Sequence, residues 1–303
     1  MGTISEYFKD PSIVMRALGR RGLLCWMSDE TFVKMMFRFH EGRRIDLNDP
    51  KSLNEKLQWL KLYDRDPKYT EMVDKYRVKD YIKKTIGEEY VIKTLGVWEN
   101  ANDIDFGALP NRFVLKTNHD SHSIIICKDK KEFDERTARK ALNRSLKNNG
   151  YWYGREWPYK NVKPCILAEE YLQNTDGTPL IDYKFYCYGG QPIYFMVSYG
   201  EAEHNVRNHK FDMQCNSIDH LFKKTPAIKA EDAFIPSNIS EMINIVKELC
   251  GHNEHIRIDL YNIDGKIYFG EITYYSSAGF MNICSQEYSD YLASLIHIPP
   301  VLR

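Results

Sequence analysis

Apolar residues recur every three to four positions through the first part of the chain, a spacing that predicts helices. One helix begins after a cap at Ser28 and buries an apolar face, and a second spans 53–63 with Ser52 as its cap. A third spans 72–86 and ends at Gly87, a residue that commonly stops helices. The N-terminal part is therefore expected to be helical.

From residue 88 the pattern changes to short apolar runs separated by polar turns, which predicts strands. Three pairs of runs predict hairpins: 112–117 with 123–128, 181–188 with 192–198, and 255–262 with 266–274. Single strands are predicted at 90–97, 164–172 and 210–216, and helices at 131–148 and 240–250. No repeat or long linker interrupts the chain. The pattern predicts a mixed α+β protein with antiparallel hairpins.

Composition excludes several classes of protein. The 303 residues are 43% hydrophobic, enough for a substantial core. Lys+Arg and Asp+Glu both count 42, which argues against a nucleic-acid binder. The seven cysteines are scattered without a Cys-x-x-Cys pair, so neither a disulfide framework nor a zinc ribbon is indicated. With neither a signal peptide nor an apolar run of about 18 residues, we expect a cytoplasmic protein.

The strongest chemical signal lies in the last predicted hairpin. Alternation places Arg257, Asp259, Glu271 and Thr273 on one face, while the residues between them are apolar. Two carboxylates beside a cation are costly to bury unless another charge lies among them, and Mg²⁺ with phosphate oxygens fits. A cross-strand ion pair on a solvated face explains the same residues equally well.

Weaker signals lie upstream. Lys116 ends a predicted strand before the polar loop 117–123, which can hold a phosphate or be an exposed hairpin tip. Glu169-Glu170 ends another strand and can accept from a nucleotide, or it can face solvent at a sheet edge. Asp182 and Lys184 follow, and Lys75 lies near the start of the third predicted helix.

The order of these signals resembles the ATP-grasp superfamily, and more closely its TupA-like family, which is found in bacterial surface-polysaccharide gene clusters. The resemblance covers about residues 30–285. It is carried by four motifs in family order: 53–64 (LNEKLQWLKLYD), 74–78 (DKYRV), 113–119 (FVLKTNH) and 182–185 (DYKF).

The resemblance implies an ATP-grasp fold, in which two α+β subdomains hold a nucleotide between them. It implies a helical N-terminal extension over 1–87, a first subdomain with the phosphate loop over 88–165, and a second subdomain with the metal site over 166–303. ATP and Mg²⁺ are the implied cofactors. Two positions depart from the family pattern: Asp120 and His122 replace loop glycines, and Thr273 stands where the superfamily usually has asparagine.

The resemblance also implies a role for each candidate residue. Arg257 and Lys116 would be catalytic, and Asp259, Glu271 and Thr273 would hold metal. The nucleotide would be bound by Lys75, Lys116, Ser121, Ser123, Glu169, Glu170, Tyr171, Leu172, Asp182 and Lys184.

The implied reaction joins a carboxylate to an amine through an acyl phosphate. The family context suggests an amino acid or amine and a uronic acid of a capsular or O-antigen glycan, which is either free or lipid-linked. Residues 130–163 carry ten Lys/Arg against four Asp/Glu with interleaved aromatics, which fits either an anionic glycan or a solvated helix and loop. Seven Lys/Arg against three Asp/Glu over 16–44 fit a solvated helix or peripheral membrane contact.

Three other functions remain open. A sugar or polyol kinase would use the same scaffold without an amine, and a glycosyltransferase would use a metal-binding Asp-x-Asp pair such as Asp103 and Asp105. That pair has no partner motif. A scaffold without turnover is the third alternative, although Lys116, Arg257, Asp259 and Glu271 are all present.

Overall fold

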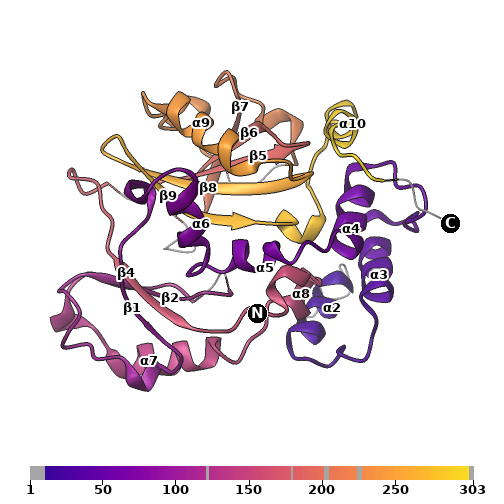
Figure 1. The fold of residues 1–303 in the computed structure, drawn as a ribbon. Helices are drawn as coiled ribbons and strands as arrows, with labels where there is room; N and C mark the ends of the chain where they lie inside the picture. The colour runs from indigo at the N-terminus through magenta and orange to yellow at the C-terminus, as the bar shows by residue number, and fades with distance from the viewer. Residues whose placement is uncertain (1–10, 121–122, 179, 201–204, 224–226, 300–303) are drawn as a thin grey trace.

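A computed structural model describes residues 11–120, 123–178, 180–200, 205–223 and 227–299. It contains two antiparallel sheets, one with strand order β1-β4-β2-β3 and one with order β7-β6-β5-β8-β9. Helices α5 and α6 lie between the two sheets, and α2, α3 and α4 lie beside them (Figure 1). The predicted α+β class is confirmed. Within the described residues, no helix is long and apolar enough to cross a bilayer.

The N-terminal helices begin where the sequence predicts caps. Ser28 accepts from the amide of Thr31 at the start of α3, and Ser52 forms a capping box with Glu55 at the start of α4. The helices are α2 (Pro11–Arg20), α3 (Asp29–Glu41), α4 (Leu53–Tyr63), α5 (Lys68–Val73) and α6 (Val78–Thr85).

The single helix predicted over 72–86 is wrong, because the chain leaves the helix at Asp74. Its Oδ1 accepts from the amides of Tyr76 at 2.9 Å and Arg77 at 3.2 Å, a local turn that competes with helical bonding. The amide of Lys75 donates instead to the carbonyl of Asn118. Lys75 therefore lies between α5 and α6 and is tied to the loop after β2.

The first sheet contains β1 (Thr94–Trp98), β2 (Phe113–Thr117), β3 (Ile125–Cys127) and β4 (Ile166–Glu170). The predicted β2–β3 hairpin is confirmed by its antiparallel register. Helix α7 (Glu135–Ser145) covers this sheet, and Leu142 and Ala138 join its core. The helix is shorter than predicted, and a 3₁₀ turn over Lys130–Glu132 precedes it.

The second sheet contains the other two predicted hairpins, and both are confirmed. Its strands are β5 (Asp182–Tyr188), β6 (Gln191–Tyr199), β7 (Arg207–Asp212), β8 (His255–Ile263) and β9 (Lys266–Thr273). Helix α9 (Ile239–Cys250) packs against β6 and β8, and Val246 is fully buried in that core. Helix α10 (Gln286–Leu295) follows and packs against α4.

Strand pairing bears on the proposed subdomain boundary. A division at residue 166 separates β4 from β1 and β2, the strands with which it pairs. The pairing places β4 with the first sheet, so we propose a boundary after Glu170. The two sheets meet near Val91, which forms a parallel bridge to Phe269 of β9.

Candidate functional site

Four polar residues of β8 and β9 lie together on one face of the second sheet. Arg257 is opposite Thr273 and Asp259 is opposite Glu271 in the register. The Arg257 guanidinium donates to both oxygens of Asp259, from Nε at 2.6 Å and Nη2 at 2.7 Å. Nη2 also lies 2.7 Å from Glu271 Oε1, which accepts from the Thr273 hydroxyl at 3.3 Å. The alternation seen in the sequence thus becomes a bonded cluster.

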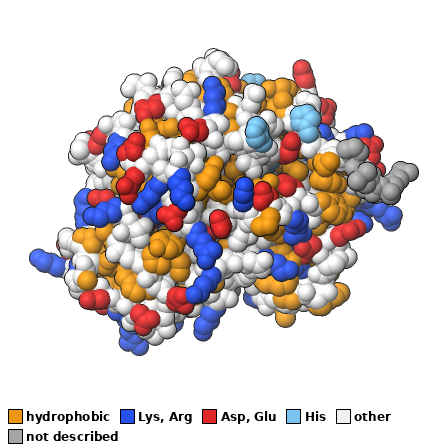
Figure 2. Space-filling model, viewed as in Figure 1, with side chains coloured by type: hydrophobic (Ala, Val, Ile, Leu, Met, Phe, Trp, Pro, Cys, Tyr) orange, Lys and Arg blue, Asp and Glu red, His pale blue; other side chains and the backbone are white. Residues whose placement is uncertain are grey.

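Two lysines from other elements complete this charged cluster. Lys184 of β5 is the cross-strand neighbour of Asp259, and its Nζ lies 3.2 Å from Asp259 Oδ2 and 3.7 Å from Asp182 Oδ1. Lys75 Nζ lies 3.2 Å from Glu271 Oε2. Three cations and three carboxylates therefore converge from β5, β8, β9 and the α5–α6 connection. Figure 2 shows acidic and basic side chains intermingled across the middle of the molecule, between the two sheets.

Lys75 also links the cluster to the predicted phosphate loop. Its Nζ donates to the carbonyl of Asp120 at 2.8 Å. The start of the loop is not an exposed hairpin tip, because Thr117, Asn118 and His119 are all buried. Because Lys75 Nζ contacts both this loop and Glu271, the loop backbone lies near β9, where a shared ligand could reach both.

Hydroxyl groups fix the loop itself. The Ser123 hydroxyl accepts from the amide of Thr117 at 2.8 Å, and the Ser145 hydroxyl donates to Asp120. Burial would raise the pKa of Asp120, but hydrogen bonds from Ser123, Ser145 and Thr117 hold it below its ordinary value. The carboxylate that replaces a family glycine is thus anchored within the loop. Ser121 and His122 lie outside the described residues.

Lys116 and Glu169 form a second charged group on the first sheet. Lys116 Nζ lies 2.5 Å from Glu169 Oε2, and Lys79 Nζ lies 2.6 Å from Oε1. Lys79 also donates to the carbonyl of Ile92 at 2.8 Å. Glu170 is exposed, whereas Tyr171 and Leu172 are half-buried. Sequence reasoning missed Lys79, because a lysine on a helix is usually solvated.

The charges set the protonation states of the site. Burial would raise the pKa of Glu271, but Lys75, Arg257 and Lys184 hold it well below its ordinary value. Burial would likewise raise the pKa of Glu169, and Lys116 and Lys79 lower it. Both acids are therefore carboxylates at neutral pH, as ligands of a cation must be.

Tyr261 lies between the two charged groups and was also missed. It shares the face of Arg257 and Asp259 on β8 and is the cross-strand neighbour of Asp182. Asp182 first, then burial, and then Glu271, Asp259 and Glu169 raise the pKa of Tyr261 well above its ordinary value. Carboxylates of both sheets thus contribute to the raised pKa of the Tyr261 hydroxyl. The alternation 257, 259, 261 is the signal that could have found it.

The chain turns sharply just after β9. Tyr275, Ser277 and Ala278 all adopt left-handed backbone angles, with φ of 55°, 55° and 56°. Such angles cost roughly 1–3 kcal/mol for each non-glycine residue and often mark functional sites. The Ser276 hydroxyl in this turn accepts from Arg257 Nη1 at 3.3 Å. The strained turn is therefore part of the charged cluster.

Helix α4 holds this turn through a polar stripe. Gln58 Nε2 donates to the carbonyls of Ala278 at 3.1 Å and Gly279 at 2.9 Å, and Lys61 Nζ donates to Ala278 at 2.8 Å. Asn54 accepts from the amide of Met281 at 2.9 Å. These residues belong to the first family-like motif, and the fold gives that motif a physical role that the sequence did not reveal.

A carboxyl group without a hydrogen-bond or ion-pair partner among the described residues lies beside the same turn. Burial raises the pKa of Glu156 to about 7, against the opposing charges of Lys61 and Arg257. The side chain nevertheless keeps partial solvent exposure, as does Tyr159, whose pKa burial raises well above its ordinary value. Both residues are thus recessed but reachable by solvent close to Arg257, which suits contact with a second substrate.

Part of the basic, aromatic stretch over 130–163 is buried, whereas Lys147 and Lys160 are exposed, so the glycan-binding surface stays a prediction. Arg155 is 1% exposed, and Tyr151 and Trp157 are buried as well. Arg155 donates to backbone carbonyls of the N-terminal region instead of facing a glycan. Local charge density could not reveal this, because the rings of Phe32, Tyr151 and Trp152 enclose the guanidinium.

The donor set fits magnesium and a triphosphate. Among the described residues, no group of three or more His, Cys, Asp and Glu could hold a metal alone. Asp259 and Glu271 offer two carboxylates, and Mg²⁺ commonly completes such a site with water and phosphate oxygens. The surrounding lysines and Arg257 can neutralise phosphate. The Asp103-x-Asp105 pair lies between β1 and β2 of the first sheet. There the Asp105 carboxylate accepts from the amide of Gly107.

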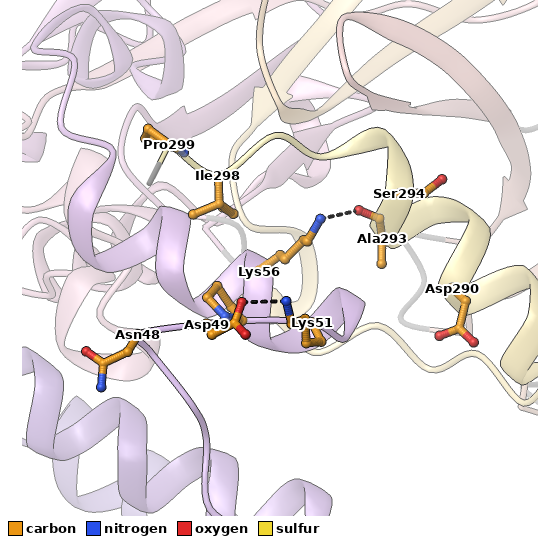
Figure 3. A pocket seen from close by; sticks show the side chains of 10 residues that line it. Asn48, Asp49, Lys51, Lys56, Asp290, Ala293, Ser294, Ile298 and Pro299 are labelled. Atoms are coloured by element: carbon orange, nitrogen blue, oxygen red, sulfur yellow. Dashed lines mark hydrogen bonds and ion pairs between the residues drawn. The ribbon is translucent and has the colours of Figure 1, made fainter. Parts of the chain in front are cut away.

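A cavity of about 470 Å³ lies elsewhere, between the segment before α4 and the end of α10 (Figure 3). Lys56 borders it and donates to the carbonyl of Ala293. A second cavity of about 440 Å³ lies beside α7. Neither contains a predicted site residue.

Comparison with known proteins assigns this arrangement to a family. A family model described as TupA-like ATPgrasp matches residues 55–297, which includes both sheets and both charged groups. The match confirms the family resemblance and the ATP-grasp fold expected from the sequence. A search of curated proteins found no match.

Solved structures with a similar fold are ligases of low sequence identity. A D-alanine–D-alanine ligase from Bacillus anthracis complexed with ATP has 13% identity and a TM-score of 0.41, covering 67% of this chain and 55% of that one. The Helicobacter pylori enzyme has 17% identity and a TM-score of 0.42, with coverage of 82% and 70%. An L-amino acid ligase from Bacillus licheniformis has 12% identity and a TM-score of 0.39, with coverage of 84% and 55%. The chain thus spans little more than half of two of these proteins, and similarity this remote assigns no function.

Proposed function

The chain belongs to the TupA-like ATP-grasp family, and from this membership we propose that it is a ligase that uses ATP and Mg²⁺ to join a carboxylate to an amine. The observation that carries the proposal is the convergence of Lys75, Lys184 and Arg257 on Asp259 and Glu271. This cluster combines a divalent-metal donor set with cations for phosphate. Both are needed to position a phosphoryl group and neutralise its charge.

Each charged residue has a role in this proposal. Asp259 and Glu271 hold Mg²⁺ with help from the Thr273 hydroxyl, and Lys75, Lys116 and Lys184 bind phosphate oxygens. Arg257 lies against both carboxylates and stabilises the charge that develops as phosphoryl transfer proceeds. The loop carrying Ser121 and Ser123 contributes backbone amides.

The nucleoside is proposed to lie at the first sheet. Glu169 with the backbone of Glu170, Tyr171 and Leu172 accepts from and donates to the adenine, and Asp182 binds the ribose. Glu169 is ionised because Lys116 and Lys79 flank it, so it is a strong acceptor. Lys79 keeps Glu169 charged when Lys116 turns toward phosphate.

ATP supplies the phosphoryl group that turns the carboxylate of the substrate into an acyl phosphate, and the amine then displaces phosphate as the amide bond forms. We propose a uronic acid of a capsular or O-antigen glycan as the carboxylate, and an amino acid or amine as the nucleophile. Two features support this assignment: Arg257 and Ser276 can bind an anion beside the metal ligands, and the recessed Glu156 can bind an ammonium group.

The direct test is an ADP-release screen of amino acids against uronic-acid glycans, with products identified by mass spectrometry. The proposal requires ADP release that depends on both the carboxylate and the amine, together with the mass of an amide. ADP formed without any amine, accompanied by a phosphorylated sugar, would instead identify a kinase. Transfer of a sugar from a nucleotide sugar without ATP would identify a glycosyltransferase.

A further inference from the structure

The turn between α2 and α3 displays apolar side chains to solvent. Trp26 is 79% exposed and Leu23 is 58% exposed, whereas Leu24 between them is buried. The indole Nε1 of Trp26 donates to the carbonyl of Leu23 at 3.1 Å, so the two residues form one unit. Single exposed apolar residues are ordinary, but an exposed tryptophan beside an exposed leucine is a candidate contact surface.

A buried arginine holds this turn in one conformation. Arg155 Nη2 donates to the carbonyls of Leu24 at 2.7 Å and Met27 at 3.3 Å, and Nη1 lies 3.7 Å from Asp29 Oδ1. Its guanidinium lies over the rings of Phe32, Tyr151 and Trp152. Burying a guanidinium is costly unless its donors are paired; Nη1 and Nη2 of Arg155 have partners, whereas its Nε has no hydrogen-bond partner among the described residues. Arg155 therefore supports the turn in which Trp26 is exposed.

Helix α2 extends the same surface. Its buried side packs on α8 (Tyr151–Gly154), where a Cβ at Gly19 would come within 2.3 Å of the carbonyl oxygen of Trp152. Ile13 and Val14 on the other side are exposed, as are Arg20 and Arg21 at the end of the helix. We call these residues the basic apolar surface: Ile13, Val14, Arg20, Arg21, Leu23 and Trp26.

The segment that carries this surface is basic, as is the stretch over 136–155 elsewhere in the chain. Residues 11–28 contain three arginines and no Asp or Glu, although the whole chain has formal net charge zero. In Figure 2, hydrophobic side chains gather at the lower right, where Figure 1 shows α2 and the turn that follows it. Apolar and basic groups thus lie side by side in this segment, and the acids Asp29 and Glu30 follow it at the start of α3.

We propose that the basic apolar surface binds the interface of an anionic phospholipid bilayer. Trp26 and Leu23 enter the headgroup region, where the amphipathic indole is favoured, and Arg20 and Arg21 bind lipid phosphates. A bilayer supplies hydrocarbon and dense negative charge together. A second protein is less suited, because specific interfaces usually bury about 800 Å² per partner and this surface has only four exposed apolar side chains.

The position of the surface relative to the site gives the proposal a consequence. Helix α2 packs against α8, and the chain that follows α8 contains Glu156 and Tyr159, which border the Arg257 cluster. Docking at α2 therefore keeps the charged cluster near the bilayer, where a lipid-linked substrate would be within reach. The membrane proposal itself stands without the ligase proposal, since vesicle binding is measured without substrate.

Flotation of the full chain with unilamellar vesicles tests the proposal. Vesicles of phosphatidylcholine with phosphatidylglycerol should carry the protein to the top of a density gradient, whereas phosphatidylcholine alone should carry far less. Raising the salt concentration should weaken binding, because the arginine contribution is screened. Absence of flotation with the anionic vesicles at low salt, or equal flotation with both vesicles, would overturn the assignment.

Variants identify the residues that bind. Leu23→Ser with Trp26→Ser should lower vesicle affinity at least about tenfold, since both apolar anchors are lost. Arg20→Gln with Arg21→Gln should lower it by roughly tenfold or more for anionic vesicles. Both variants should keep the wild-type unfolding temperature, because their side chains are exposed.

Two matched controls make the result specific. Phe234→Ser removes an aromatic that is 57% exposed, close to the exposure of Leu23, and that follows Glu231 and Asp232 in the chain. Arg136→Gln with Lys140→Gln removes two exposed bases of α7. Both should float like the wild type. Equal losses of vesicle binding in the controls would refute the assignment of binding to the basic apolar surface. A concentration-dependent dimer that Leu23→Ser with Trp26→Ser abolishes, without vesicle binding, would refute the bilayer and identify a second copy as the occupant.

Discussion

Helix α4 and the second sheet each hold cations that are buried or partly buried, and the two regions differ in what these cations bind. On α4, Lys61 donates to the backbone carbonyl of Ala278, and Lys56 donates to carbonyls at the end of α10. On the second sheet, Lys184 and Arg257 pair with side-chain carboxylates. Both regions satisfy buried charge, but with partners of a different kind.

This difference in partners separates cations that stabilise the fold from cations that bind ligands. A backbone carbonyl is part of the chain path, so a lysine that binds one fixes two segments relative to each other. A carboxylate on a side chain can exchange its cation for a metal ion while the cation moves to phosphate. The α4 lysines are therefore expected to govern stability, and the cations of the second sheet to govern ligand binding.

The largest expected effect comes from removing the carboxylates that pair with the sheet cations. Asp259→Asn with Glu271→Gln keeps side-chain volume but removes both metal-ligand charges. ATP turnover that depends on Mg²⁺ should fall by about a thousandfold or more, while circular dichroism stays that of a folded protein. Coupled measurement of ADP release gives the turnover.

The matched control for this variant is Glu231→Gln with Asp232→Asn, which removes two exposed acids from the same half of the chain. Its turnover should equal that of the wild type. Retained turnover in Asp259→Asn with Glu271→Gln would show that the carboxylates bind only the neighbouring cations, and the distinction between the two regions would fail.

The next largest effect is expected in the α4 region. Gln58→Leu removes two hydrogen bonds to the strained turn and leaves the carbonyl of Gly279 without its Gln58 donor. The free energy of unfolding should fall by about 2–3 kcal/mol, as chemical denaturation would measure. Part of this loss reflects the left-handed angles of Ser277 and Ala278, which the fold must hold in place.

Lys184→Met provides the opposing case. Asp259 keeps two hydrogen bonds from Arg257, so the free energy of unfolding should change by less than about 1 kcal/mol. The rise in unfolding temperature caused by Mg-ATP should shrink, because a phosphate-binding cation is gone. A Lys184→Met protein that loses stability but keeps the Mg-ATP shift would reverse the proposed roles.

These two regions were not equally accessible from sequence. The Arg257–Glu271 cluster was predictable because strand alternation and a short turn fix which side chains face one another. The α4 stripe contacts residues more than 200 positions away, so no local pattern indicates its partners. Lys79 was missed for the same reason, since its importance depends on the carboxylate that the fold brings near, whereas the alternation of 257, 259 and 261 could have indicated Tyr261.

Local competition explains the errors within single elements. Apolar spacing predicted one helix over 72–86, but the Asp74 side chain binds the next amides and ends the first helical segment. The basic stretch around Arg155 suggested an exposed surface, yet three aromatic rings and two backbone carbonyls enclose that guanidinium. In both cases a side chain found a partner that hydrophobic periodicity and net charge do not describe.

A smaller effect is expected at Glu55, a carboxylate whose partners belong to the structural framework and are not proposed ligand-binding cations. Burial would raise the pKa of Glu55, but Arg43 and the amides of Ser52 and Lys51 lower it from 4.5 to about 2. A lowered pKa contributes stability that is present above pH 4.5 and is lost as the pH falls toward 2. Glu55→Gln should therefore lose on the order of 2 kcal/mol at pH 7 and show a flatter stability profile between these pH values.

Comparison with Glu271 distinguishes a structural carboxylate, Glu55, from one in the proposed ligand-binding region. The pKa of Glu271 is also low, but its cations are the proposed phosphate ligands. Denaturation with and without Mg-ATP should give the same loss for Glu55→Gln in both conditions, because its partners belong to α4 and the preceding segment. A loss that depends on Mg-ATP would place Glu55 in the ligand-binding region.

The smallest effect is expected at Lys56, whose ammonium binds the carbonyl of Ala293 at 2.7 Å (Figure 3) and that of Ile296 at 2.8 Å. A cation at a helix C-terminus satisfies carbonyls that lack helical partners and interacts favourably with the helix dipole. Lys56→Met should cost about 1 kcal/mol, and amide exchange should speed up at the end of α10. Mg-ATP binding should be unchanged.

Lys51 is the matched control because it borders the same cavity but forms its ion pair with Asp49, and both side chains are largely exposed (Figure 3). Exposed ion pairs contribute little, so Lys51→Met should change stability by less than about 0.5 kcal/mol. Equal losses in the two variants would mean that charge near the cavity matters and the backbone partners do not. A loss confined to Lys56→Met would show that a lysine stabilises this fold by the carbonyls it joins, which is the property that the cations beside Asp259 lack.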